Sequence, residues 1–262
     1  MTTSSPLVLI TGASSGIGQA LTQAYLQNGW RVALLARRTD VLQQWLDSLP
    51  QKPAAGQTCI LGADVGDADD MGRAAQQCMT EMGLPDVVIA NAGISLGVDT
   101  AEREDLAVFE QVLRTNTLGV AHTFQPFIRA MQARGHGKLV GIASVAGIRG
   151  LPGHGAYCAS KAAVISYCES LRGELRTQGL EVITIAPGYI ATPLTARNRY
   201  PMPFLMSAEA FAQSALRCID RGTRYRVIPW SMGIVAKILK VLPDALFDRL
   251  LQGQPRKHRH KD

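Results

Sequence analysis

Short runs of β-branched and aliphatic residues alternate with longer stretches of helical periodicity along most of the chain, and this alternation restricts the fold more than any other feature. The pattern is typical of βαβ units on a parallel sheet. Several runs are apolar throughout, as expected for strands that helices cover on both faces. The expected strands are Leu7–Thr11, Arg31–Leu35, Thr58–Ala63, Val87–Ala90, Lys138–Ile142, Val182–Ala186 and Tyr225–Ile228.

The stretches with helical periodicity include Gly18–Asn28, Ala68–Met82, Leu106–Ala133 and Tyr157–Thr177. No linker, repeat or low-complexity tract interrupts the alternation before the basic residues near position 256. The 262 residues therefore predict a single α/β domain, a Rossmann-like doubly wound parallel sheet of about seven strands with helices on both faces. In such sheets ligands bind beyond the carboxyl ends of the strands.

Composition narrows the class of protein further. Hydrophobic residues make up 47% of the chain and charged residues 18%, which is typical of a folded globular protein. No apolar run approaches the roughly 20 residues that span a bilayer, and Met1–Pro6 has no basic signal-peptide region, so we expect a cytoplasmic protein. The five cysteines are widely spaced, which predicts reduced thiols and no metal site. Much of the net charge of +6 lies in Arg256–Lys261, which predicts a solvated tail with no nucleic-acid partner, or else a contact with an anionic surface.

A glycine-rich segment, Thr11–Gly18, joins the first expected strand to the first helix. Glycines allow the backbone to approach a pyrophosphate, and a helix N-terminus offers free N–H groups. The spacing is G-x-x-x-G-x-G, and a simple strand-to-helix connection is the alternative interpretation. The segment resembles the cofactor loop of the short-chain dehydrogenase/reductase family. The resemblance implies that the cofactor contacts Gly12, Ser14, Ser15, Gly16, Ile17 and Gly18.

The end of the second expected strand indicates which nicotinamide cofactor is used. Ala36 occupies the place where an acidic residue would bind the ribose 2′-hydroxyl of NAD, and Arg37 and Arg38 follow it. Guanidinium groups bind a 2′-phosphate through charge-assisted hydrogen bonds. The pair therefore predicts NADP(H), with a solvated arginine pair at the start of a surface helix as the alternative.

Two further segments follow expected strands and line the same edge of the sheet. By resemblance, Asp64 and Val65 contact the adenine ring, although Asp64 is equally suited to cap the helix that begins at Ala68. The turn Asn91, Ala92 and Gly93 resembles the family's N-A-G turn, which stabilises the central sheet and lines the cofactor cleft.

Four polar residues match the family's catalytic set in order and spacing: Asn116, Ser144, Tyr157 and Lys161. Tyr157 and Lys161 lie four residues apart and so share one helix face. An unperturbed tyrosine has a pKa of about 10, and a nearby ammonium should lower it toward neutrality, as acid–base catalysis requires. Ser144 can donate to the substrate oxygen. Asn116 either holds a water that connects Lys161 to solvent or kinks its own helix through a local hydrogen bond.

The resemblance implies an NADP(H)-dependent oxidoreductase that interconverts a carbonyl and a secondary alcohol. Pro187 and Gly188 resemble the family's P-G turn, with Ile190 and Thr192 expected at the nicotinamide. Bulky apolar residues near Tyr200 and Phe204 predict a hydrophobic, lipid- or steroid-like substrate, although simple packing of the loop is the alternative. His154, three residues before the tyrosine, is a further candidate for substrate contact. Two alternatives to this function are an acyl-carrier-linked 3-oxoacyl reductase and a catalytically idle NADP(H)-binding regulator.

We expect the catalytic domain to span residues 1–229, an amphipathic helical extension of the same domain to span 230–252, and a basic tail to span 253–262. In the extension, one helical face with flanking Lys237 and Lys240 is followed, after Pro243, by a second short apolar helix. This extension either caps the pocket, joins a subunit interface or docks peripherally on a membrane. By resemblance, we expect a homodimer or homotetramer formed through the helices that carry Asn116 and Tyr157.

Overall fold

The computed structural model describes residues 5–196, 198 and 201–253. Its central sheet has seven parallel strands in the order β3-β2-β1-β4-β5-β6-β9. The strands are β1 (Leu7–Thr11), β2 (Arg31–Ala36), β3 (Thr58–Gly62), β4 (Val87–Ala90), β5 (Gly137–Ile142), β6 (Leu180–Pro187) and β9 (Tyr225–Ile228). All seven expected strands are confirmed. The strand order reverses between β1 and β4, which is where a crevice opens at the carboxyl edge of such a sheet.

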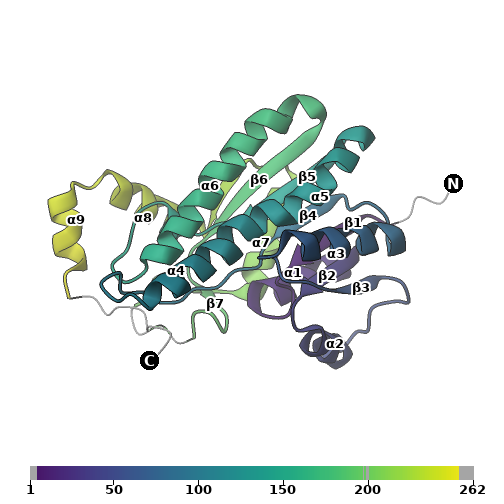
Figure 1. Ribbon diagram of the computed structural model, residues 1–262, viewed down its shortest axis with the longest axis horizontal. Coiled ribbons are helices and arrows are strands. Elements are labelled where there is room, and N and C mark those ends of the chain that lie inside the picture. Colours follow the sequence, from purple (N-terminus) through teal and green to yellow (C-terminus); the bar gives the residue numbers. More distant parts are fainter. Residues whose placement is uncertain (1–4, 197, 199–200, 254–262) are drawn as a thin grey trace.

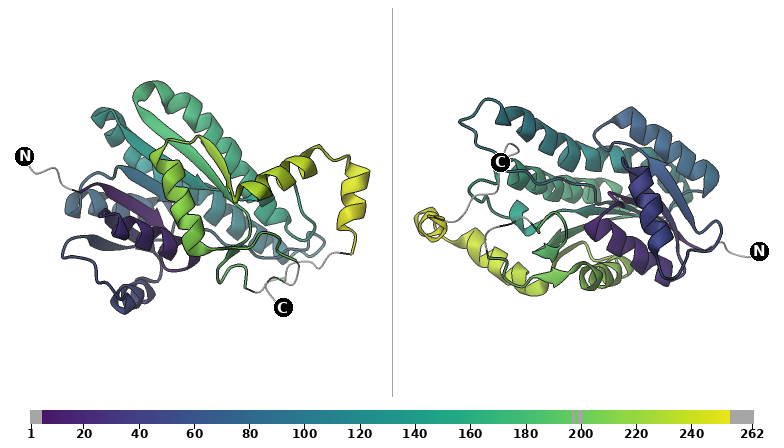
Figure 2. Two further views of the ribbon diagram at one scale, coloured as in Figure 1. Left: turned by 180° about the vertical axis from the view of Figure 1, so that it is seen from behind. Right: turned by 90° about the horizontal axis from the view of Figure 1, so that it is seen from below.

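Helices cover both faces of this sheet (Figures 1 and 2). One layer contains α1 (Gly16–Gln27), α2 (Thr39–Ser48) and α7 (Ala208–Asp220). The other contains α3 (Ala68–Glu81), α5 (Gly119–Arg134) and α6 (Gly155–Leu175), with α4 (Asp105–Leu113) packed against α6. The doubly wound architecture is therefore as predicted.

Strand β1 explains why the central strands are apolar at every position. Leu7 and Leu9 belong to the core beneath α3, α5 and α6, whereas Val8 and Ile10 belong to the core beneath α1, α2 and α7. Successive side chains of a strand point to opposite faces, so a strand between two helical layers buries both sets. All four side chains are fully buried.

The helix expected over Leu106–Ala133 is not a regular α-helix. It divides into α4, a π-helical turn at Arg114–Leu118 and α5. π-turns of this kind often accompany functional sites because they displace a side chain from the regular helical face. Here the turn contains Asn116.

The C-terminal extension forms two helices, α8 (Trp230–Val241) and α9 (Asp244–Leu251), as expected. They project beyond the sheet at the end of the molecule where α9 is labelled in Figure 1. A short parallel pair, β7 (Ile190–Ala191) with β8 (Met206–Ser207), precedes α7. Within the described ranges, no helix is both long and apolar enough to span a bilayer.

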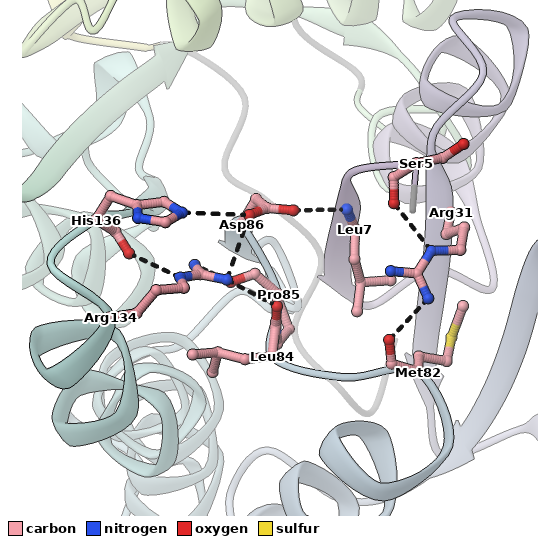
Figure 3. Close-up of polar contacts among 9 residues, drawn as sticks. All are labelled: Ser5, Leu7, Arg31, Met82, Leu84, Pro85, Asp86, Arg134 and His136. Carbon is pink, nitrogen blue, oxygen red and sulfur yellow. Dashed lines mark hydrogen bonds and ion pairs between the residues drawn. The ribbon is translucent and has the colours of Figure 1, made fainter. Parts of the chain in front are cut away.

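Polar contacts link several elements at the amino ends of the strands, opposite the crevice (Figure 3). Asp86, just before β4, accepts a 2.9 Å hydrogen bond from the main-chain N–H of Leu7 and forms a 3.3 Å ion pair with Arg134. The Arg134 guanidinium also donates to the carbonyl of Pro85 at 2.7 Å. Arg31 donates to the carbonyl of Met82 at 2.8 Å. These bonds connect β1, β2 and β4 with α3 and α5.

Candidate active site

A cleft of about 440 Å³ opens at the carboxyl ends of the strands. Its walls bring together segments that are far apart in the sequence: the turn after β1, the ends of β2 and β3, the N-A-G turn, the end of β5, α6 and the P-G turn. Every expected cofactor residue lines this cleft except Gly18. The lining also includes Ser144, Tyr157 and Lys161.

The main chain of the glycine-rich turn packs closely against neighbouring main-chain atoms, which requires glycine as the sequence indicated. Gly12 and Gly16 have φ values of +66° and +54°, a conformation that favours glycine. A methyl group on Gly12 would lie 2.7 Å from the Cα of Ala92, and one on Gly18 would lie 2.2 Å from the carbonyl oxygen of Gly12. Gly18 thus packs α1 against the turn, and it does so from outside the cleft. In the described structure the side chain of Ser15 does not cap α1, which leaves amide groups at the helix N-terminus for an anion.

The N-A-G turn is bonded to the end of β1. The Thr11 hydroxyl accepts hydrogen bonds from the N–H groups of Asn91 at 3.0 Å and Ala92 at 3.1 Å. The Asn91 side chain donates to the Thr11 carbonyl at 2.9 Å. These contacts hold the ends of β1 and β4 at the bottom of the cleft.

Arg37 and Arg38 line the cleft at the end of β2. The Arg37 guanidinium lies 3.6 Å from the carboxylate of Asp64, and both side chains are exposed. Asp64 also accepts a 2.9 Å hydrogen bond from the N–H of Gly66. It does not cap α3, because Asp67 is the N-cap residue and accepts from the N–H of Asp70. Asp64 is therefore free of the capping role and faces the cleft.

Ser144, Tyr157 and Lys161 converge at the other end of the cleft. Ser144 follows β5, and its hydroxyl is hydrogen bonded to that of Tyr157 on α6. The Lys161 ammonium lies 5.9 Å from the centre of the Tyr157 ring and donates a 2.8 Å hydrogen bond to the carbonyl of Ile142. The i, i+4 spacing and the strand end thus place all three polar groups on one wall.

Burial dominates the pKa values of both titratable groups in this set. It raises the pKa of Tyr157, an effect that the hydrogen bond from Ser144 partly opposes. It lowers the pKa of Lys161 to about 8, because the ammonium is enclosed by protein. The pKa of Tyr157 in this structure therefore moves in the opposite direction from the sequence-based expectation, which considered the lysine charge and not the loss of solvent.

Asn116 is fully buried behind the wall and does not line the cleft. Its side-chain oxygen accepts from the N–H of Ile94 at 2.8 Å, and its amide donates to the Ile94 carbonyl at 2.9 Å and to the Ser160 hydroxyl at 3.0 Å. All three bonds connect Asn116 to residues outside its own helix. The alternative that Asn116 kinks its own helix through a local hydrogen bond is therefore wrong. The side chain links the segment after the N-A-G turn to α6, beside Lys161.

The expected substrate residues are less closely associated with the cleft. His154 is buried, with Nδ1 3.1 Å from the carbonyl oxygen of Pro152, and does not line the cleft. Phe204 is half exposed and is also outside the lining. Tyr200 lies outside the described residues. Contact of these residues with a substrate stays a prediction.

Comparison of the sequence with known protein families gives a match over most of the chain. A family model of short chain dehydrogenases matches residues 6–202. The chain belongs to the short chain dehydrogenase family.

Similar proteins match nearly the whole chain. An uncharacterized oxidoreductase of Myxococcus xanthus (strain DK1622) is 39% identical over 241 residues, covering 92% of this chain and 94% of the relative. An uncharacterized oxidoreductase of Mycobacterium tuberculosis (strain H37Rv) is 32% identical, with 92% and 96% covered. A short chain dehydrogenase from Burkholderia cenocepacia J2315, solved in complex with NADP, superposes with a TM-score of 0.80 at 23% identity and covers 95% of this chain and 98% of that one.

Several residues that line the cleft of this short chain dehydrogenase were not predicted from the sequence. Ile94, Thr115, Pro193, Leu194 and Thr195 contribute to its walls. The Thr195 hydroxyl donates to the carbonyl of Ile190 at 2.6 Å and accepts from the N–H of Thr192 at 3.1 Å, so it shapes the segment after the P-G turn. The sequence could have indicated this role, because a threonine hydroxyl three residues after Thr192 is well placed to bond to the local backbone.

Proposed function

We propose that this protein is an NADP(H)-dependent oxidoreductase that interconverts a carbonyl and a secondary alcohol on a hydrophobic substrate. The observation that carries the proposal is the convergence of Ser144, Tyr157 and Lys161 on one wall of the cleft that also contains the glycine-rich turn. An idle nucleotide-binding regulator would have no use for a serine hydroxyl bonded to a buried tyrosine hydroxyl beside a lysine.

The residues of the cleft fit a nicotinamide dinucleotide. The uncapped amide groups at the start of α1 suit a pyrophosphate, and a side chain at Gly12 in the turn before them would collide with the main chain of Ala92. Arg37 and Arg38 lie where a 2′-phosphate of NADP(H) would be bound, and Ala36 leaves no carboxylate to repel it. Ile190 and Thr192 would flank the nicotinamide end.

The chain's own residues supply the proton chemistry. Bound nicotinamide would supply the hydride for carbonyl reduction and accept it in the reverse direction. The Tyr157 hydroxyl donates a proton to the substrate oxygen during reduction, and the raised pKa keeps this hydroxyl protonated before the reaction. Ser144 donates a hydrogen bond that orients the same oxygen and stabilises its negative charge. Lys161 adds positive charge behind Tyr157.

Apolar side chains support a hydrophobic substrate. Ile94 and Leu194 line the cleft, and Leu194, Phe204 and Leu205 are about half exposed on the segments that follow the P-G turn. Polar substrates would gain no compensating hydrogen bonds from these groups, whereas an apolar carbonyl compound would shield them from water.

A homodimer or homotetramer remains part of the proposal. Leu106 on α4 and Leu118 in the π-helical turn are half exposed, and covering them would remove apolar surface from water. Both leucines belong to the helical stretch that carries Asn116, one of the two through which we expect subunits to pair.

The oxidation of NADPH and of NADH, followed at 340 nm across a panel of apolar ketones and aldehydes, tests the proposal. We expect turnover with NADPH that falls at least about 100-fold in Tyr157→Phe, since general acid catalysis contributes a factor of that order. Tyr167→Phe, a change on the same helix away from the cleft, is the matched control. Unchanged turnover in Tyr157→Phe would overturn the mechanism. Turnover confined to acyl-carrier thioesters would favour the 3-oxoacyl reductase instead.

A further inference from the structure

An apolar stripe runs along the outer side of α8. Trp230, Ile234, Ile238 and Val241 are spaced four, four and three residues apart and so lie on one helix face. Trp230 is 66% exposed and Val241 is 80% exposed. On α9, Leu246 and Leu250 are likewise more than half exposed. Soluble surfaces contain scattered apolar residues, but a continuous stripe of this size indicates a contact surface.

The charges on α8 are all positive, whereas α9 carries Asp244, Asp248 and Arg249. Lys237 and Lys240 are exposed on α8, at the positions that border one side of the stripe. The sequence of α8 contains no acidic residue. Soon after α9 the sequence adds the basic run Arg256–Lys261. An apolar stripe bordered by lysines has the composition of a helix that lies in the interface of an anionic membrane.

Arg149 holds these helices in place. Its guanidinium donates to the carbonyl of Leu242 at 2.6 Å and to that of Leu239, and it forms a 2.7 Å ion pair with Asp244. The same group lies 3.8 Å over the ring of Phe247. Arg149 itself belongs to the segment that follows Ser144, so α8 and α9 are fixed relative to the catalytic wall and the stripe is a surface of the folded body.

The first turn of α8 packs against the cleft. A methyl group on Gly188, in the P-G turn, would lie 2.8 Å from the Cγ of Met232, which is buried under the helix. The buried side of α8 thus contacts a segment that lines the cleft, while its opposite side carries the stripe. A surface bound to the stripe would contact the outer side of the helix whose inner side packs on the P-G turn.

We propose that the stripe on α8 and α9 docks on an anionic lipid surface, with Trp230, Ile234, Ile238 and Val241 inserted between the headgroups and Lys237 and Lys240 paired with lipid phosphates. A second copy of the chain is a poorer occupant. An antiparallel twofold contact would place the same patch against itself and bring the lysines of both copies to the same side of the interface.

Co-sedimentation with vesicles tests this inference without cofactor or substrate. Wild-type protein should sediment with vesicles of phosphatidylcholine and phosphatidylglycerol, and far less with phosphatidylcholine alone. The double variant Ile234→Glu/Ile238→Glu should bind more than about tenfold more weakly, whereas Ile234→Leu/Ile238→Leu should bind like wild type. Lys237→Glu/Lys240→Glu should weaken binding by about tenfold or more, and the corresponding double arginine variant should retain it.

Three outcomes would overturn the inference: no sedimentation of the wild type, equal sedimentation of the glutamate and leucine pairs, or a wild-type oligomer that the glutamate pair splits while no vesicle binding occurs. The last result would assign the stripe to a second copy. All substituted side chains are exposed, and circular dichroism checks that the variants fold. A protein that binds vesicles but reduces no carbonyl compound would refute the proposed function and leave the docking inference standing.

Discussion

The Lys161 ammonium donates a 2.8 Å hydrogen bond to the main-chain carbonyl of Ile142, the last residue of β5. The bond joins α6 to the strand that leads into Ser144, and the lysine side chain is only 4% exposed. A single buried cation therefore sets the separation between the two elements that carry the catalytic hydroxyls, and its enclosure lowers its own pKa to about 8.

This enclosure predicts a pH dependence of stability in the cofactor-free protein. An unfolded lysine titrates near pH 10.4, so between roughly pH 8 and that value the unfolded chain binds more protons than the folded one, and stability rises with pH. Below about pH 8 the buried ammonium exerts its full destabilising effect. Relative to Lys161→Met, the wild type should gain on the order of 2 kcal/mol in unfolding free energy between about pH 7 and pH 10.

Urea unfolding at several pH values across this window measures the effect. The substitution also changes packing, which shifts both ends of the curve equally, so only the slope of the difference is diagnostic. If the unfolding free energies of the two proteins changed equally with pH, Lys161 would not have the lowered pKa that its burial predicts.

Gly147 should be essential for the geometry of the catalytic wall. A methyl group there would lie 2.6 Å from the carbonyl carbon of Lys161 and 2.7 Å from its oxygen, both main-chain atoms that cannot move independently of α6. Gly147→Ala should therefore cost roughly 1–3 kcal/mol and reduce kcat, because Ser144 and Tyr157 would be pushed apart. Gly150→Ala, where the added methyl meets nothing within 4 Å, is the matched control. Thermal unfolding and turnover are measured on both; identical behaviour of the two variants would contradict the close packing.

Arg37 should decide the cofactor preference. Arg37→Asp removes a guanidinium from the cleft and places a carboxylate beside Asp64, so we expect kcat/KM for NADPH to fall at least about tenfold relative to that for NADH. Arg73→Asp, an exposed arginine on α3 outside the cleft, should leave the ratio unchanged. An unaltered ratio in Arg37→Asp would mean that the 2′-phosphate is bound elsewhere.

The polar network at the opposite edge of the sheet should affect stability alone. Arg134→Met removes the 3.3 Å ion pair with Asp86 and the bonds to the carbonyls of Leu84 and Pro85, so we expect a loss of about 1–3 kcal/mol in unfolding free energy. Because these groups lie at the amino ends of the strands, KM and kcat of the folded variant should stay at wild-type values. A fall in kcat at temperatures where the variant is folded would reveal coupling through the sheet.

The amino-acid sequence alone determined the seven strands, their burial on both faces and the positions of the glycine-rich turn, Ser144, Tyr157 and Lys161. These features follow from local rules: alternation of apolar runs, the freedom of glycine and the i, i+4 spacing on a helix. The two helices after Trp230 followed in the same way from their apolar periodicity.

Tertiary structure decided what depends on contacts between segments distant in the chain. Only the folded chain shows that Asp67 and not Asp64 caps α3, that Asn116 bonds to Ile94 and Ser160, and that Arg149 holds α8 and α9. Tertiary structure also decided the direction in which the pKa of Tyr157 shifts, because every element packed on the side chain contributes to its loss of solvent. Sequence spacing specifies the direction of a side chain on its own element, whereas its partners and its access to water exist only once the layers have packed together.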